Sequence, residues 1–205
     1  MDGQPGETKR MGPKPKPLHR FRESAAKASA IAEEPWMETI YRRAFNGFES
    51  MSTVRSDGWA QRGGIDRKIN LVDARSVFVE EKFRFVEYSD ILLERWSDRR
   101  RRKPGWIQQR LLCDYVSYIV VPSRTMLLLP YLDLRRAWLR EGRRWVRQYK
   151  ARIAENLGYE TESVAIPKAV LLKAIVAGFE FHWTADEEEG VHDAAQLSFD
   201  WSERL

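Results

Sequence analysis

The chain has 205 residues, of which 43% are hydrophobic, enough for one domain with a core of its own plus terminal tails. Its formal net charge is +5, which favours a polyanionic partner such as nucleic acid but is also shared by many soluble proteins without one. The single cysteine, Cys113, excludes an internal disulfide and favours a reducing, cytoplasmic setting, and the sequence has neither an apolar run of membrane-spanning length nor the apolar core of a secretory signal.

The two ends are predicted to contribute little to the core. Residues 1–28 are rich in Pro, Gly, Lys and Arg, and a segment of this composition buries too little surface to order itself. It is either a basic arm that lies on phosphates or a solvated tail. Residues 185–205 form an acidic tail, a type of segment that is usually disordered or used for interactions. Residues 29–184 are therefore predicted to form a single domain.

The domain is predicted to begin with a helix between residues 29 and 48. Apolar residues recur there at helical spacing, and Pro35 suits a position in the first turn. Residues 51–60 are a weak candidate for the first strand.

The stretch from residue 63 to residue 85 is predicted to form two strands joined by a polar turn, because apolar and polar residues alternate with a period of two. Asp66 on the first strand and Glu80 and Lys82 on the second are expected to share one face. Two carboxylates this close repel each other unless a cation or a shared proton lies between them. Magnesium prefers oxygen ligands of this kind. Gly63 and Gly64, at the start, predict a bulge or a close backbone approach.

The remaining elements are predicted from the same periodicities. They are, in chain order, a short helix within 90–98, a helix at 106–121, a buried strand at 125–132, a long basic helix at 134–157, a short edge strand at 163–166 and a helix at 167–179. Five basic residues precede the second of these helices: Arg99, Arg100, Arg101, Arg102 and Lys103. Such a run is usually a solvated loop. Because it follows the strand that carries Glu80 and Lys82, we expect it to bind the backbone of a nucleic acid.

Asp66 followed by Glu80-Glu81-Lys82 resembles the signature of the PD-(D/E)XK nuclease superfamily. Ile65 stands where the motif has proline, whereas its Glu-x-Lys half is intact. The similarity covers roughly residues 35–134 and implies an α/β (α+β) protein with a restriction-endonuclease-like α-β-β-β-α-β core, here with extra C-terminal helices and flexible tails.

The resemblance also implies a metal site. Asp66 and Glu80 would hold Mg²⁺, or Mn²⁺ in its place, with the help of the Glu81 carbonyl group. Lys82 would orient the attacking water or stabilise the charge of the transition state.

Two further residues enter the predicted site through the resemblance. A helix before the sheet often contributes a glutamate, for which Glu38 is the candidate by position and Glu34 the reserve. The alternative is a glutamate favoured by a helix N-terminus. Several branches of the superfamily place a polar helix residue near the site, which points to Gln109, although this residue can equally be a surface glutamine.

Three functions are compatible with these patterns. The first is a magnesium-dependent deoxyribonuclease, structure-selective rather than sequence-specific, that acts on DNA rather than RNA, either as a monomer or as a homodimer. The second is a catalytically inactive nucleic-acid-binding or regulatory module on the same fold, for example in a phage or mobile element. The third is a structural or partner-binding α+β protein in which Asp66, Glu80 and Lys82 form a surface salt-bridge cluster, which would add little stability.

Overall fold

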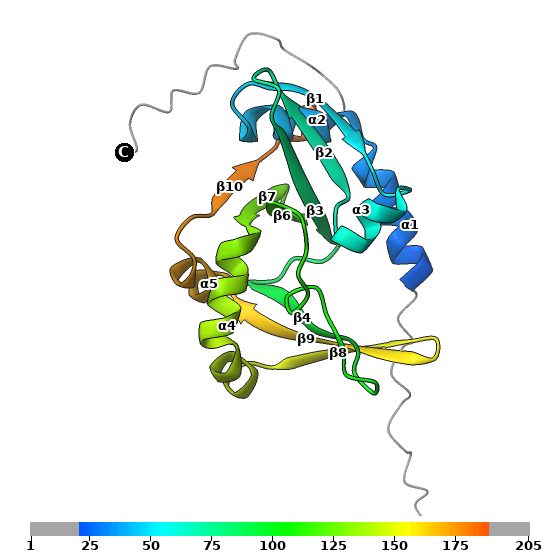
Figure 1. The fold of residues 1–205 in the computed structure, drawn as a ribbon, viewed down its shortest axis with the longest axis vertical. Helices are drawn as coiled ribbons and strands as arrows, with labels where there is room; N and C mark the ends of the chain where they lie inside the picture. Colours follow the sequence, from blue (N-terminus) through cyan, green and yellow to red (C-terminus); the bar gives the residue numbers. More distant parts are fainter. Residues whose placement is uncertain (1–20, 189–205) are drawn as a thin grey trace, which may run out of the picture.

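Two β-sheets organise residues 21–188, the part of the chain that the computed structural model describes (Figure 1). The first sheet has the strand order β1-β2-β3-β6-β7-β10, with bounds Phe48–Thr53, Arg67–Leu71, Ser76–Arg84, Tyr115–Val120, Thr125–Pro130 and Phe179–His182. The second sheet has the order β5-β4-β9-β8, with bounds Lys103–Pro104, Asp90–Asp98, Tyr159–Pro167 and Ala151–Asn156. The fold is therefore of the mixed α+β class.

The first sheet is mixed in direction. β1, β2 and β3 form an antiparallel meander, whereas β3 and β6 run parallel. A parallel pair needs a long crossover connection, which is usually a helix. Here the connection passes through β4 and β5 of the second sheet, so the two sheets are joined within one crossover.

One face of the first sheet is covered by α1 (Phe21–Ala32) and α2 (Pro35–Ala44) (Figure 1). Trp36, Met37 and Ile40 are almost fully buried on α2, at the spacing of one helical face, and pack in a cluster with Ile69 and Val79 of the sheet. Burial of this face fixes which side chains of β2 and β3 point the opposite way.

The other face of the first sheet shares a core with the second sheet. This core includes Tyr118 and Leu127 from the first sheet and Leu93 and Ile166 from the second. Three helices border it: α3 (Gly58–Gly63), α4 (Tyr131–Gln148) and α5 (Lys168–Ala174). The two sheets therefore enclose the space in which the polar side chains of β3 and β4 meet.

Several predicted elements are confirmed. The helix that begins at Pro35 is α2, the pair of strands within 63–85 is β2 and β3, and the buried strand at 125–132 is β7. The weak first strand is β1, shifted toward the N-terminus, and the residues after it form α3.

The helix predicted at 106–121 is wrong. Residues 106–114 form turns and irregular structure, and Tyr115–Val120 is the strand β6. β6 lies between β3 and β7 with core on both of its faces, so it is apolar apart from the buried Ser117 and lacks the alternation of a half-exposed strand. The helix predicted within 90–98 is wrong as well, because these residues form β4.

Other predictions fail in the C-terminal third of the chain. The long basic helix ends at Gln148, and residues 151–156 form β8. The strand at 163–166 belongs to β9, which lies between β4 and β8 and is not an edge strand. Helix α5 ends at Ala174, and Phe179–His182 forms β10.

Gly63 and Gly64 do not lie in a strand. Gly63 ends α3, and Gly64 caps this helix in the left-handed conformation, at a φ of 63°. Glycine is favoured there because other residues are strained at positive φ. A Cβ atom on Gly64 would also lie 2.6 Å from Leu111, so the close approach is to the protein's own loop.

The predicted tails lie largely outside the described residues, which exclude 1–20 and 189–205. Where the structure describes them, they are helical: residues 21–28 lie in α1, and Ala185–Glu188 forms α6. Within residues 21–188, no helix combines the length and the apolar character that crossing a membrane requires.

Candidate active site

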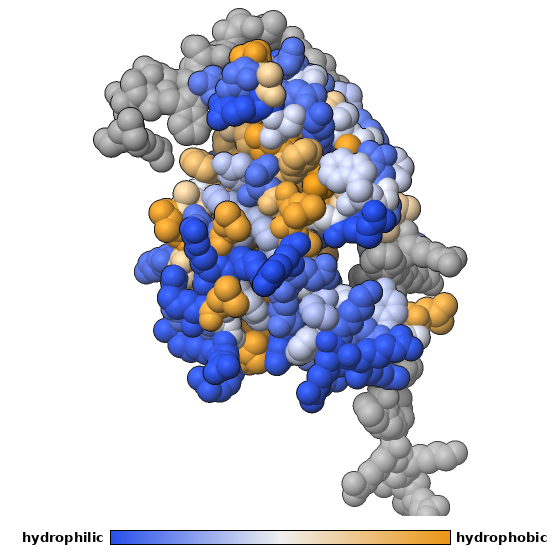
Figure 2. Space-filling model, viewed as in Figure 1, coloured by the Kyte–Doolittle hydropathy of each residue, from blue (hydrophilic) through white to orange (hydrophobic). Residues whose placement is uncertain are grey.

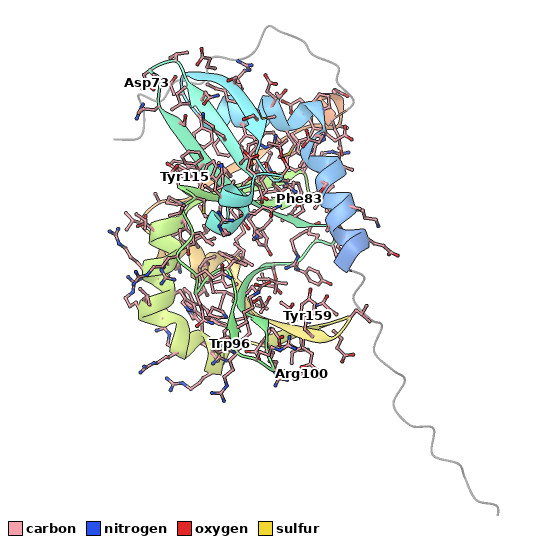
Figure 3. The ribbon with its side chains drawn as sticks, turned by 45° about the vertical axis from the view of Figure 1, so that its right-hand side comes forward. Asp73, Phe83, Trp96, Arg100, Tyr115 and Tyr159 are labelled. Carbon is pink, nitrogen blue, oxygen red and sulfur yellow. The ribbon has the colours of Figure 1, made fainter. Side chains whose placement is uncertain are left out.

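Asp66, Glu80 and Lys82 line one cavity of about 540 Å³ between the first sheet and β4. Phe83, which also lines the cavity, marks its position in Figure 3. The structure therefore brings together the three residues around which the predicted metal site was built.

The register of β2 and β3 explains this convergence. Arg67 lies opposite Val79, and the backbone N–H of Asp66 donates to the Val79 carbonyl oxygen at 2.9 Å. The N–H of Glu81 in turn donates to Oδ2 of Asp66 at 2.8 Å, which fixes the carboxylate beside β3. Glu80 and Lys82 are two residues apart on that strand and leave it on the same face.

The charges in the cavity are closely coupled. The ammonium group of Lys82 donates a hydrogen bond to Oε1 of Glu80. Burial opposes the charged form of Lys82, but the carboxylates of Glu80 and Asp66 outweigh it and raise the pKa of this amine. Burial and the repulsion from Glu80 together raise the pKa of Asp66 to about 6. A cation beside these carboxylates would relieve the repulsion between them.

The side chain of Glu81 points away from the cavity and is fully buried on the α2 side of the sheet. Its carboxylate accepts hydrogen bonds from Arg67 Nε at 2.8 Å, Tyr41 Oη at 2.8 Å and Arg55 Nη2 at 2.6 Å. Arg55 also lies 3.7 Å from Oδ1 of Asp66, so it links this buried pair to the cavity. The carboxylate of Glu81 is thus a structural group, and only its carbonyl remains available for the predicted metal role.

Glu94, which the sequence analysis missed, lines the same cavity from β4 of the second sheet. The backbone N–H of Trp106 donates to its carboxylate. Burial raises the pKa of Glu94 and Glu80 adds to this effect, while Lys82 acts in the opposite direction. The signal for Glu94 was a charged residue directly after the apolar run Ile91-Leu92-Leu93, which the helix prediction for this segment obscured.

Gly105 holds the backbone of Glu94 in place. A Cβ atom at Gly105 would lie 2.2 Å from the carbonyl oxygen of Glu94 and 2.7 Å from its Cγ, distances that backbone atoms cannot accommodate. We expect Gly105→Ala to lower the free energy of unfolding by about 1 to 3 kcal/mol through overpacking, as measured by urea denaturation. Gly58→Ala is the control, because its Cβ atom would make only an ordinary contact, 3.5 Å from Nη1 of Arg62, and its φ is not positive. A Gly105→Ala variant as stable as the wild type would contradict this packing.

The two residues that were added through the resemblance behave differently. Glu38 lies on the exposed side of α2, where it pairs with Arg42 at 2.6 Å, and it does not line the cavity. The reserve, Glu34, is the exposed N-cap residue of α2. Gln109 does line the cavity, but from a loop and not from a helix, and its Nε2 donates to the Pro104 carbonyl oxygen at 2.9 Å.

The run of basic residues is partly neutralised by the protein itself. Arg99 pairs with Glu160 and Glu162 of β9, and Arg100, labelled in Figure 3, also pairs with Glu160. Arg101 pairs with Asp98, whereas Arg102 and Lys103 are exposed and have no ion-pair partner within residues 21–188. Only part of the predicted nucleic-acid-binding run is therefore free to meet a phosphate.

The side chains in the cavity fit an open metal site with two carboxylate ligands and do not fit a closed cage of protein ligands. Among residues 21–188, no group of three or more His, Cys, Asp or Glu side chains is arranged to hold a metal ion, so a closed cage such as a structural zinc site does not fit. Magnesium is usually held by one or two carboxylates, with waters and substrate phosphates as its other ligands. Asp66 and Glu80 match this donor set.

Comparison of the chain with protein-family models, with curated proteins and with solved structures finds no match. The functional conclusion therefore depends on the chemistry of the cavity.

Proposed function

We propose that this protein is a magnesium-dependent nuclease that hydrolyses phosphodiester bonds in DNA. The observation that carries the proposal is the convergence of Asp66, Glu80 and Lys82 in one cavity. The order α2-β1-β2-β3 followed by a strand parallel to β3 supports the resemblance to a PD-(D/E)XK core. The departure from that core is the crossover, in which β4 and β5 stand in place of a helix.

In this proposal Asp66 and Glu80 hold the ion. A bound magnesium ion supplies an activated water and polarises the scissile phosphate. The ammonium group of Lys82, which Glu80 holds by a hydrogen bond, offsets negative charge that develops on the phosphate or orients the water. Glu94, fixed by the N–H of Trp106, adds a negative charge close to Lys82 and helps to keep this amine protonated.

A nucleic-acid substrate is supported by the basic side chains of α4. Figure 2 shows hydrophilic side chains covering the half of the molecule that holds α4 and the β8–β9 hairpin. Arg143 and Arg147 of α4, and Lys150 just after its end, are exposed there and have no ion-pair partner within the described part of the chain. Such groups can neutralise phosphates, which makes binding salt-dependent.

The decisive assay uses single-stranded, double-stranded and branched DNA, and RNA, with Mg²⁺, Mn²⁺ or EDTA. We expect cleavage of DNA in Mg²⁺ or Mn²⁺ and none in EDTA. Lys82→Met and Glu80→Gln should each lower the cleavage rate by roughly 100-fold or more, since each removes a charge that acts on the transition state. Their affinity for DNA, measured in EDTA, should stay within a few-fold of the wild type.

Lys68→Met is the matched control, because Lys68 lies on β2 of the same meander but does not line the cavity. Its cleavage rate should equal that of the wild type. DNA binding without cleavage in any metal would favour the inactive nucleic-acid-binding module. The absence of both binding and cleavage would favour a purely structural role.

A further inference from the structure

A second cavity of about 540 Å³ adjoins the candidate active site. It lies between the loop at residues 87–89, the start of β4 and the strands β7 and β10. Tyr118 of β6 lines both cavities, so they meet at this residue. The buried side chain of Tyr118 therefore forms a wall between the candidate active site and a neighbouring cavity.

Tyr88, which lines the second cavity, is half exposed and lies near two guanidinium groups. The Arg84 guanidinium lies 4.8 Å from its ring centroid, and the Arg152 guanidinium lies 5.9 Å from it. Arg84 also donates to Oη of Tyr118 at 2.9 Å, so it is fixed at the junction of the two cavities. An aromatic ring beside arginine side chains is the type of surface on which unpaired bases stack. The longer contact, to Arg152, is the one that a base can replace.

Asp90 supplies an acceptor beside this ring. Its Oδ1 atom is buried and has no hydrogen-bond partner within residues 21–188, and the two nearest cations are Arg84 Nη2, 3.9 Å from Oδ1, and Arg152 Nη2, 3.9 Å from Oδ2. Since Oδ1 is shielded from solvent, a ligand donor would reach this carboxylate at Oδ2, on a side chain that is 17% exposed.

The charges of the second cavity argue against a phosphate as its occupant. Glu87, Asp90 and Glu180 all line it, and the three cations beside it are already paired, Lys168 with Glu180 and both Arg84 and Arg152 with Asp90. His182 is held by Thr125, whose Oγ1 lies 3.3 Å from its Nδ1. A neutral, flat ligand with amino groups suits these surroundings better than an anion does.

We propose that the second cavity binds an unpaired nucleobase of the substrate strand, stacked on Tyr88, with an amino group of the base donating to Asp90. This inference rests on the proposed function, because it places the neighbouring phosphodiester in the cavity with Asp66 and Glu80. It makes the protein selective for single-stranded or frayed DNA. It also favours adenine, cytosine and guanine, which carry exocyclic amino groups, over thymine, which has none.

The test is the binding of short fluorescent oligonucleotides, oligo(dA), oligo(dC) and oligo(dT), to the full chain in EDTA, where cleavage does not interfere. Stacking of one base is worth about 1 to 3 kcal/mol, so Tyr88→Ala should weaken binding of oligo(dA) by roughly 5- to 150-fold. Tyr88→Phe should retain binding, since it keeps the ring. Asp90→Ala should reduce the preference for oligo(dA) over oligo(dT), since it removes the acceptor. Tyr159→Ala is the matched control, because Tyr159 lies on the β8–β9 hairpin and lines neither cavity (Figure 3).

A second readout reports stacking directly. The fluorescence of 2-aminopurine within a single strand should be quenched on binding to the wild type and to Tyr88→Phe, but not on binding to Tyr88→Ala. Equal binding and equal quenching by the wild type and Tyr88→Ala would overturn the base site, while cleavage in Mg²⁺ would still support the nuclease. Conversely, quenching that depends on Tyr88 without cleavage in any metal would support the base site and contradict the nuclease.

Discussion

Asp66→Asn is expected to raise the free energy of unfolding at pH 8 by about 1 to 3 kcal/mol while it abolishes cleavage. Burial and the nearby Glu80 raise the pKa of Asp66 to about 6, above the 3.8 that is usual for aspartate. Between these two pH values the folded protein binds more protons than the unfolded chain, so stability falls as the pH rises. Above pH 6 the full cost of ionising Asp66 is present. Asparagine avoids this cost and can still accept the hydrogen bond from the Glu81 N–H.

Urea denaturation at pH 4 and pH 8 measures this effect. The advantage of Asp66→Asn should be largest at pH 8 and should shrink toward pH 4, where the wild-type carboxyl group is protonated in the folded state. Asp73→Asn is the control, because Asp73 is an exposed turn residue whose pKa is lowered by Arg75. Groups placed for function often lower the stability of the fold. An Asp66→Asn variant no more stable than the wild type at pH 8 would show that the ionised Asp66 carboxylate has no such cost.

Glu81→Leu is expected to lower the free energy of unfolding by about 3 to 5 kcal/mol, because removal of one partner leaves a buried charge uncompensated. The Arg67 side chain is only 3% exposed, and its Nε lies 2.8 Å from Oε1 of Glu81. Tyr41 and Arg55 lose a hydrogen-bond acceptor in the same variant. Urea denaturation at pH 7 measures the loss.

Glu38→Ala is the control for the loss of a glutamate from an ion pair. Glu38 and Arg42 are each close to half exposed, so their pair should contribute no more than about 0.5 kcal/mol. The double variant Arg67→Met/Glu81→Leu should regain part of the stability lost in Glu81→Leu, because it removes the unpaired charge as well. A cost for Glu81→Leu as small as that for Glu38→Ala would contradict the structural role assigned to the buried pair.

The centre of the candidate site could be predicted from the sequence because it depends on local periodicity. Alternation along β3 places Glu80 and Lys82 on one face of this strand. A short turn joins β2 to β3, so that Asp66, the residue just before β2, lies beside β3. The same alternation sends Glu81 to the opposite face, toward Arg67. None of these positions depends on contacts with distant parts of the chain.

The remainder of the site depends on pairing between distant segments. Glu94 reaches the cavity only because β4 pairs with β9, about 70 residues further along the chain. Periodicity alone does not distinguish a short apolar strand from a helix, so β4 and β6 were both predicted as helices. Glu38 was placed in the site by the resemblance, but α2 turns it toward solvent and buries Trp36 and Ile40 instead.

Titration of the wild type with Mn²⁺, followed by electron paramagnetic resonance of the free ion, tests the central claim most directly. The claim is that Asp66 and Glu80 together hold a divalent cation in their shared cavity. The account predicts saturable Mn²⁺ binding by the wild type, competition by Mg²⁺ and loss of binding in Asp66→Asn and Glu80→Gln, with Glu38→Ala unchanged. Equal Mn²⁺ binding by the wild type and both cavity variants, or no binding by any of them with or without DNA, would contradict it.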